Sequence, residues 1–124
     1  MGYLFVFLGG GLGAALRHGM NLAIGRLLGT AFPYGTMIVN ISGSLVMGLI
    51  AGYFAFKGGA SQHWRLFLTT GVLGGYTTFS AFSLDAALLW ERHEMALMAL
   101  YVGGSVILSI AGLFAGLFLV RHFT

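Results

Sequence analysis

The sequence predicts an all-α membrane protein with four transmembrane helices in a single domain over residues 1–124, the third helix broken at mid-membrane. Of the 124 residues, 58% are hydrophobic and only 7% are charged, whereas soluble chains carry about 25% charged residues. The apolar residues form four stretches, each near the roughly 20 residues that a bilayer span requires. The third stretch is interrupted at its centre by glycine and hydroxyl residues.

The four predicted spans cover residues 3–28, 35–56, 64–90 and 96–120, and the second and third are joined through Gly58 and Gly59. Each span contains two glycines four residues apart. This spacing places both glycines on one helix face, where a neighbouring backbone can approach closely. Lipid gives helices no hydrophobic drive to associate, so close van der Waals packing must hold them together. We therefore expect a tight bundle built on Gly9/Gly13, Gly48/Gly52, Gly71/Gly75 and Gly112/Gly116.

Composition also excludes several function classes. The six basic and three acidic residues are scattered, so the net charge of +3 does not indicate a nucleic-acid partner. The absence of cysteine excludes disulfides, thiolate metal sites and cysteine nucleophiles. His93 and Glu94 begin a HExxH zinc motif, but Leu97 stands where its second histidine belongs. We expect neither an enzyme nor a soluble partner.

Positive charge does not favour one orientation in the membrane. Lys57, Arg65 and Arg121 fall on one side of the predicted bilayer, and Arg26 and Arg92 fall on the other. Orientation follows Lys/Arg asymmetry, so a chain this balanced can insert both ways. Two opposite copies could pair about a two-fold axis in the membrane plane, as inverted repeats do in many transporters. We therefore expect an antiparallel, dual-topology homodimer in the lipid bilayer.

Residues 71–83, GVLGGYTTFSAFS, make a poor helix interior at the middle of the third span. Irregular backbone at that depth is tolerated only where protein or a cavity shields it. One interpretation is an ion site, in which freed carbonyls from two copies face a small cation. The other is a glycine-rich helix crossing whose hydroxyls bond back to the preceding turn. Composition alone does not choose between them.

Four motifs occur in order along the whole chain: GGGLGAALR at 9–17, GTMIVN at 35–40, GGYTTFSAFS at 74–83, and a Tyr101/Ser105/Ser109 series. This ordered set resembles the Fluc (CrcB) family of fluoride channels. The resemblance implies a passive, fluoride-selective channel of the cell inner membrane that exports cytoplasmic fluoride and so relieves its toxicity. It also implies a dual-topology homodimer with two pores and a structural sodium ion at its centre.

The resemblance further implies which residues form the site. By position, the polar pore residues and the two pore phenylalanines are Asn40, Tyr101, Ser105, Ser109, Phe79 and Phe82. The sodium ligands would be the backbone carbonyls of Gly74 and Thr77. Three positions depart from the family pattern, namely Ala81 for a threonine, Tyr76 for an aliphatic residue and Asp85 for a glutamate.

These residue types suit fluoride, a small and tightly hydrated anion. A pore must replace its water with donors, without a fixed cation that binds too strongly to release it. Amide and hydroxyl groups are neutral donors, and aromatic rings have positive edges. Phe79 and Phe82 share a helix face by their three-residue spacing, and Ser80 and Ser83 repeat that offset on an adjacent face, so we include them in the pore.

The same residues also have ordinary structural interpretations. A phenylalanine pair at helical spacing is typical of a core, serines in membrane helices often join neighbouring helices, and Asn40 could be a helix-terminal residue. Arg17 lies inside the first span, where it could reach the interface, cap carbonyls or attract anions into a vestibule; we favour the vestibule. Asp85 is expected near an interface, where it can pair with an arginine.

Two alternative functions remain. A small multidrug-type cation/proton exchanger is also short and four-spanning, but needs a membrane carboxylate in its first span, which here holds Arg17 and no acid. A non-transporting scaffold subunit would use its polar residues to join helices and would leave no continuous polar track. Fluoride efflux from liposomes, proton-coupled drug uptake, or neither activity would separate the three.

Overall fold

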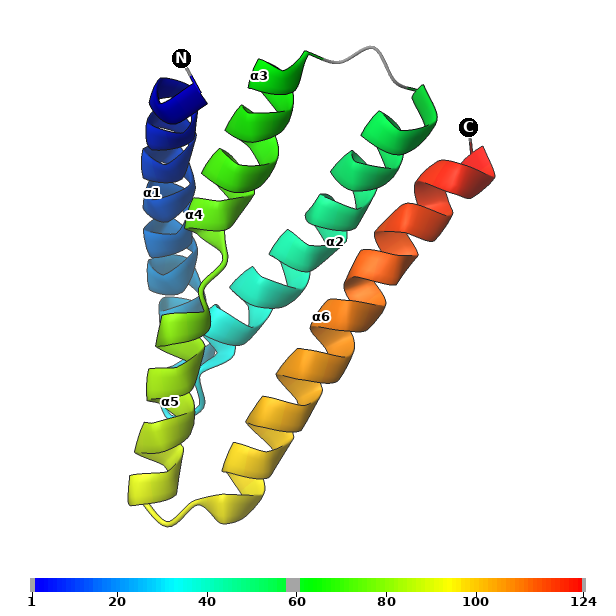
Figure 1. The fold of residues 1–124 in the computed structure, drawn as a ribbon. Helices are drawn as coiled ribbons and strands as arrows, with labels where there is room; N and C mark the ends of the chain where they lie inside the picture. The colour runs from blue at the N-terminus through cyan, green and yellow to red at the C-terminus, as the bar shows by residue number, and fades with distance from the viewer. Residues whose placement is uncertain (1, 58–60, 124) are drawn as a thin grey trace.

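The computed structural model describes residues 2–57 and 61–123, and every regular element within them is helical. The helices occupy the four predicted segments and run alternately down and up (Figure 1). The predicted connection at Gly58 and Gly59 lies outside the described residues. The elements are α1 (Gly2–Leu28), α2 (Tyr34–Lys57), α3 (Gln62–Arg65), η1 (Leu66–Leu73), α4 (Gly74–Tyr76), α5 (Phe79–Glu91) and α6 (Met95–Phe123).

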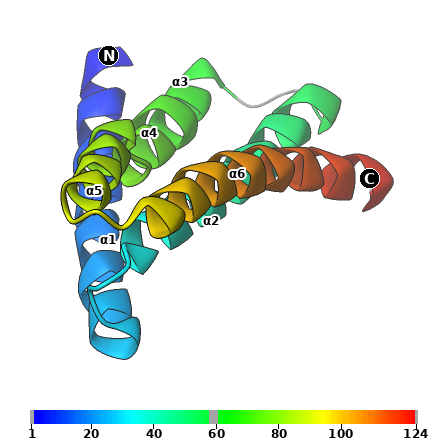
Figure 2. The same cartoon turned by 90° about the horizontal axis from the view of Figure 1, so that it is seen from below.

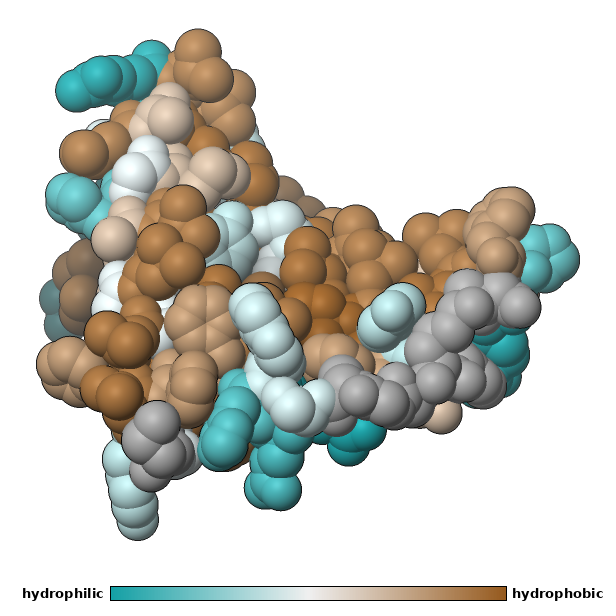
Figure 3. Space-filling model, turned by 90° about the horizontal axis from the view of Figure 1, so that it is seen from above, coloured by the Kyte–Doolittle hydropathy of each residue, from teal (hydrophilic) through white to brown (hydrophobic). Residues whose placement is uncertain are grey.

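Three helical segments of the described chain are long and apolar enough to cross a membrane: Tyr34–Ala55, Gln62–Glu91 and Met95–Phe123. The 27 residues of α1 would extend about 40 Å, but this helix carries polar groups and falls outside that set. Large apolar side chains are exposed on α1, α2, α3, α5 and α6, and brown, apolar groups dominate the face seen in Figure 3. So much exposed apolar surface is expected of helices surrounded by lipid.

The helices pack as two pairs. The first pair joins α1 to η1 and α4, and the second joins α2 to α6 along most of their length (Figures 1 and 2). Segment α5 continues from the first pair and meets α6. The broken third span therefore belongs to both pairs, and its break lies between them.

Glycines form both helix crossings. A Cβ atom added to Gly9 would lie 2.6 Å from the carbonyl oxygen of Phe67, and one added to Gly13 would overlap the backbone of Val72. In the other pair, a Cβ atom on Gly48 or Gly116 would overlap the backbone of the facing helix. Such close backbone approach is what small residues permit between membrane helices. The prediction of tight, glycine-based packing is confirmed for both crossings, although at Gly112 an added Cβ atom would have its nearest neighbour at 3.5 Å, an ordinary contact.

The third span breaks at Thr77 and Thr78, whose backbone angles are extended (φ −82°, ψ 155° and φ −151°, ψ 121°). The Thr78 hydroxyl accepts a hydrogen bond from the Ala81 N–H at 3.1 Å and so caps the start of α5. The Thr77 hydroxyl donates to the Leu73 carbonyl at 2.9 Å. The predicted break is therefore present, together with the hydroxyl bonding to the preceding turn that the alternative interpretation proposed.

One feature of the third span was not predicted. Residues Leu66–Leu73 form a π-helix, η1, in place of the expected α-helix. Within it Gly71 faces Gly9 of α1, and a Cβ atom on Gly71 would lie 3.0 Å from the Gly9 Cα atom. The wider turn thus lies at the crossing with α1 and is separated from the break by the short segment α4.

Candidate functional site

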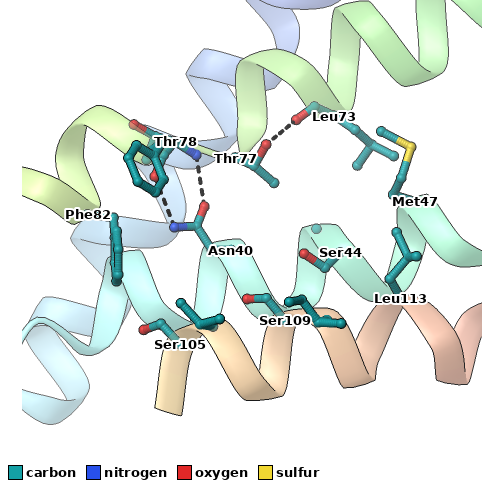
Figure 4. A pocket seen from close by; sticks show the side chains of 14 residues that line it. Asn40, Ser44, Met47, Leu73, Thr77, Thr78, Phe82, Ser105, Ser109 and Leu113 are labelled. Carbon is teal, nitrogen blue, oxygen red and sulfur yellow. Dashed lines mark hydrogen bonds between the residues drawn. The ribbon is translucent and has the colours of Figure 1, made fainter. Parts of the chain in front are cut away.

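A groove of about 380 Å³ opens beside the break, between α2, the third span and α6. Among the described residues that line it none is charged, and its polar groups are one amide and a few hydroxyls set in apolar walls (Figure 4). The lining consists of Asn40, Gly43, Ser44, Met47, Leu73, Thr77, Thr78, Phe79, Phe82, Ser105, Val106, Ser109, Ile110 and Leu113.

Asn40 joins α2 to the break through its side-chain amide. Its Nδ2 donates to the Thr78 carbonyl at 3.0 Å, and its Oδ1 accepts from the Thr78 N–H at 2.8 Å (Figure 4). An asparagine amide has two N–H donors, so one of them has no part in this pair of bonds. Asn40 is therefore both a support for the break and a neutral donor in the groove wall.

The two predicted pore phenylalanines have different surroundings. Their ring centroids are 5.5 Å apart, and both rings line the groove. Phe82 is buried and packs 5.2 Å from the ring of Tyr101. Phe79 is 77% exposed in the single chain. The groove is thus bounded by one ring fixed in the core and one that projects from the surface.

The serines of α6 reach the groove, whereas Tyr101 lies behind it. Ser105 is 4% exposed, and its hydroxyl has no hydrogen-bond partner in the described part of the chain. Ser109 lines the same groove one turn further along α6. Tyr101 is fully buried, and its hydroxyl donates to Oδ2 of Asp85 at 3.1 Å. The partner of Asp85 is therefore this tyrosine rather than the expected arginine.

Four other predicted site residues do not line the groove: Ser80, Ser83, Arg17 and Gly74. Ser80 lies at the surface, with its hydroxyl 3.2 Å from that of Thr78. Ser83 is exposed on α5, and Arg17 is partly buried on α1. Conversely, Ser44 lines the groove although the sequence analysis did not select it. Its position four residues after Asn40, on the same helix face, was the available signal.

The break also releases backbone carbonyls. In a continuous α-helix the Gly74 carbonyl accepts from the N–H of Thr78, but here that N–H donates to Asn40. Gly74 is exposed at the surface of the chain, and Thr77 follows in extended conformation. Carbonyls at unwound helices are suitable ligands for sodium, so the residues present fit the predicted ion.

Together these features define a multi-pass helical membrane protein whose candidate site is an uncharged groove at a broken helix. The family model described as "CrcB-like protein, Camphor Resistance (CrcB)" matches residues 4–117. The chain belongs to this family.

Curated relatives match the chain over nearly its whole length. "Fluoride-specific ion channel FluC" of Rhodopseudomonas palustris (strain BisB5) is 74% identical over 124 residues, which is 100% of both chains. "Fluoride-specific ion channel FluC 2" of Nitrobacter hamburgensis is 67% identical over the same full lengths. "Fluoride-specific ion channel FluC" of Methylobacterium nodulans is 63% identical over 97% of this chain and 96% of its own length. The family consists of membrane transport proteins, and the chain is not an enzyme.

Proposed function

We propose that the chain forms a passive, fluoride-selective channel that exports fluoride from the cytoplasm across the cell inner membrane. The observation that carries this proposal is the Ser105 hydroxyl, which is buried at the groove wall without a partner. A buried hydroxyl without a partner is costly unless a ligand or water satisfies it. The names of the relatives, all fluoride-specific channels, indicate which ligand that is.

The groove chemistry supports an anion that must bind and then leave. The remaining N–H of Asn40 and the hydroxyls of Ser105 and Ser109 are neutral donors in an apolar wall. Phe79 and Phe82 add ring edges, which are electropositive without carrying charge. One elementary charge crossing 100 mV is worth about 2.3 kcal/mol, so an interior-negative membrane drives fluoride outward without a coupled fuel.

The channel would be an antiparallel homodimer with two pores. Phe79 is 77% exposed beside a groove that is open on one side, so a second copy could cover both. The balanced distribution of Lys and Arg supports opposite insertion of the two copies. Each pore would then use residues of both subunits.

A structural sodium ion would lie where the two breaks meet. Its ligands would be the carbonyls of Gly74 and Thr77 from both copies. The diversion of the Thr78 N–H to Asn40 supports this, because it leaves the Gly74 carbonyl without its usual helical partner. When bound, the ion would supply a positive centre that holds four carbonyl oxygens together.

Reconstitution tests the function directly. Purified protein in potassium-fluoride-loaded liposomes should release fluoride, measured with a fluoride electrode, once an ionophore clamps the potential. Liposomes loaded with chloride should release far less. Proton-coupled drug uptake would instead support the exchanger, and the absence of both activities would support the scaffold subunit.

Sodium removal tests the ion site separately. Exchange of sodium for N-methylglucamine should lower the thermal stability of the purified dimer, and added sodium should restore it. A ligand at 100 times its Kd stabilises the folded state by about 2.7 kcal/mol. Unchanged stability over a wide range of sodium concentrations would contradict a structural sodium ion.

A further inference from the structure

A serine of α2 faces the same groove as the serines of α6. Ser44 lies one helical turn beyond Asn40 and is part of the groove lining. In Figure 4, Ser44 extends from α2, and Ser105 and Ser109 extend from α6, toward the same space. Hydroxyls therefore approach this part of the groove from two helices rather than one.

The hydroxyl of Ser44 is available for a ligand. No hydrogen-bond partner for it occurs within residues 2–57 and 61–123, and the same is true of the buried Ser105 hydroxyl. Ser42, two residues earlier in the same helix, is different. Its hydroxyl donates to the Val39 carbonyl at 3.2 Å and lies 3.0 Å from the hydroxyl of Tyr76. The Ser42 hydroxyl is thus already used in packing α2 against α4.

We propose that Ser44 is a fluoride-contacting residue of this channel, whose hydroxyl donates to the anion from the α2 wall while Ser105 and Ser109 donate from α6. This inference rests on the proposed function. A tightly hydrated anion loses most of its water when it enters a narrow path, so several donors are needed to replace its hydration shell. Ser44 adds a hydroxyl from α2, one turn beyond the Asn40 amide and beside the serines of α6, without adding charge.

The first test compares Ser44→Ala with Ser42→Ala in the liposome assay. A hydrogen bond to a charged group is worth about 1.5–3 kcal/mol, which corresponds to about a 10- to 100-fold change. We expect Ser44→Ala to lower the fluoride efflux rate by at least about tenfold, Ser42→Ala to retain it, and Ser44→Thr, which keeps the hydroxyl, to restore most of it.

Wild-type efflux separates the two proposals. If the wild-type chain conducts fluoride and Ser44→Ala conducts equally well, the role of Ser44 is wrong and the channel function stands. If the wild-type chain does not release fluoride, the proposed function itself fails, and this inference fails with it.

A second test acts on the folded channel, so it does not depend on how well Ser44→Ala assembles. The chain has no cysteine, so single cysteines can be placed cleanly. Silver ions should block efflux through Ser44→Cys and leave Ser42→Cys unaffected, and fluoride should slow the block. Equal insensitivity of the two variants to silver would overturn the assignment.

Discussion

At the scale of single residues, Asn40 connects the break in the third span to the groove. Its two hydrogen bonds to the Thr78 backbone hold the extended segment against α2, and its remaining N–H can face the groove. Sequence pattern and resemblance predicted Asn40 as a donor. They could not predict its bonds to Thr78, because the two residues are 38 positions apart and meet only through tertiary packing.

Replacement of Asn40 by alanine should reduce fluoride efflux to the background rate of fluoride-loaded liposomes that contain no protein. The variant loses both bonds to Thr78 and the free donor, at a cost in stability of about 1–2 kcal/mol for interhelical bonds in a membrane. The matched control is Asn21→Ala, which removes an amide on α1 outside the groove. Wild-type efflux from Asn40→Ala, measured with the fluoride electrode, would refute its assignment.

Alanine substitutions of the two groove phenylalanines should have different effects on stability but the same effect on fluoride transport. Phe82→Ala removes a buried ring that packs on Tyr101 and should lower the free energy of unfolding by about 3 kcal/mol or more. Phe79→Ala removes a ring that is 77% exposed and should change protomer packing little. Both should lose fluoride efflux. Thermal unfolding and efflux, measured on the same preparations, check this. A fully active Phe79→Ala channel would contradict the predicted pore.

At the scale of elements, the glycine crossings bring the helices close enough to form the groove. Gly13 lies against the backbone of Val72, whereas Gly11, on the opposite face of α1, has nothing within 4 Å of an added Cβ atom. The four-residue spacing of the glycines predicted such crossings. It could not show which helices pair, because every span carries the same motif.

A pair of alanine substitutions tests the crossing of α1. Gly13→Ala should destabilise the protein by about 1–3 kcal/mol, since its methyl group forces the two backbones apart. Gly11→Ala should be neutral or gain up to about 1 kcal/mol in helix propensity. Thermal unfolding in detergent provides the measurement. Equal effects of the two substitutions would show that the crossing is not tightly packed in solution.

The break in the third span was predictable because it has a local cause in the sequence. The π-helix was not predictable. Adjacent glycines and threonines weaken a helix wherever they occur, so residues 71–83 indicated the position of Thr77 and Thr78. Residues 66–73, LFLTTGVL, also hold two adjacent threonines and a glycine, but these residue types indicate only a weakened helix and do not indicate its π form. Their wider turn coincides with the close contact between Gly71 and Gly9, which depends on the position of another helix.

At the scale of the whole molecule, the candidate site lies at the surface of the single chain. Its groove is open on one side, and Phe79 projects beside it. The balanced charges of the sequence predict a second copy in opposite orientation, and the exposed ring and open groove leave room for such a copy; its presence and orientation stay a prediction.

Dual topology has a simple test. A single cysteine at the exposed residue Thr30 should react with a membrane-impermeant thiol reagent in about half of the molecules on intact cells, and in the rest only after permeabilisation. A cysteine at Ser61, on the opposite side of the predicted membrane, should give the same result. Complete labelling at one position and none at the other would contradict opposite insertion.

The pairing of helices also has a consequence for biosynthesis. Neither tight crossing joins neighbours in the chain, since α1 packs on η1 and α4, and α2 packs on α6. During translation, the glycine faces of α1 and α2 therefore have no packing partner until residues beyond 66 and 95 have been synthesised. A nascent chain arrested after α2 would therefore lack both tight crossings and could form only the smaller contact between α1 and α2.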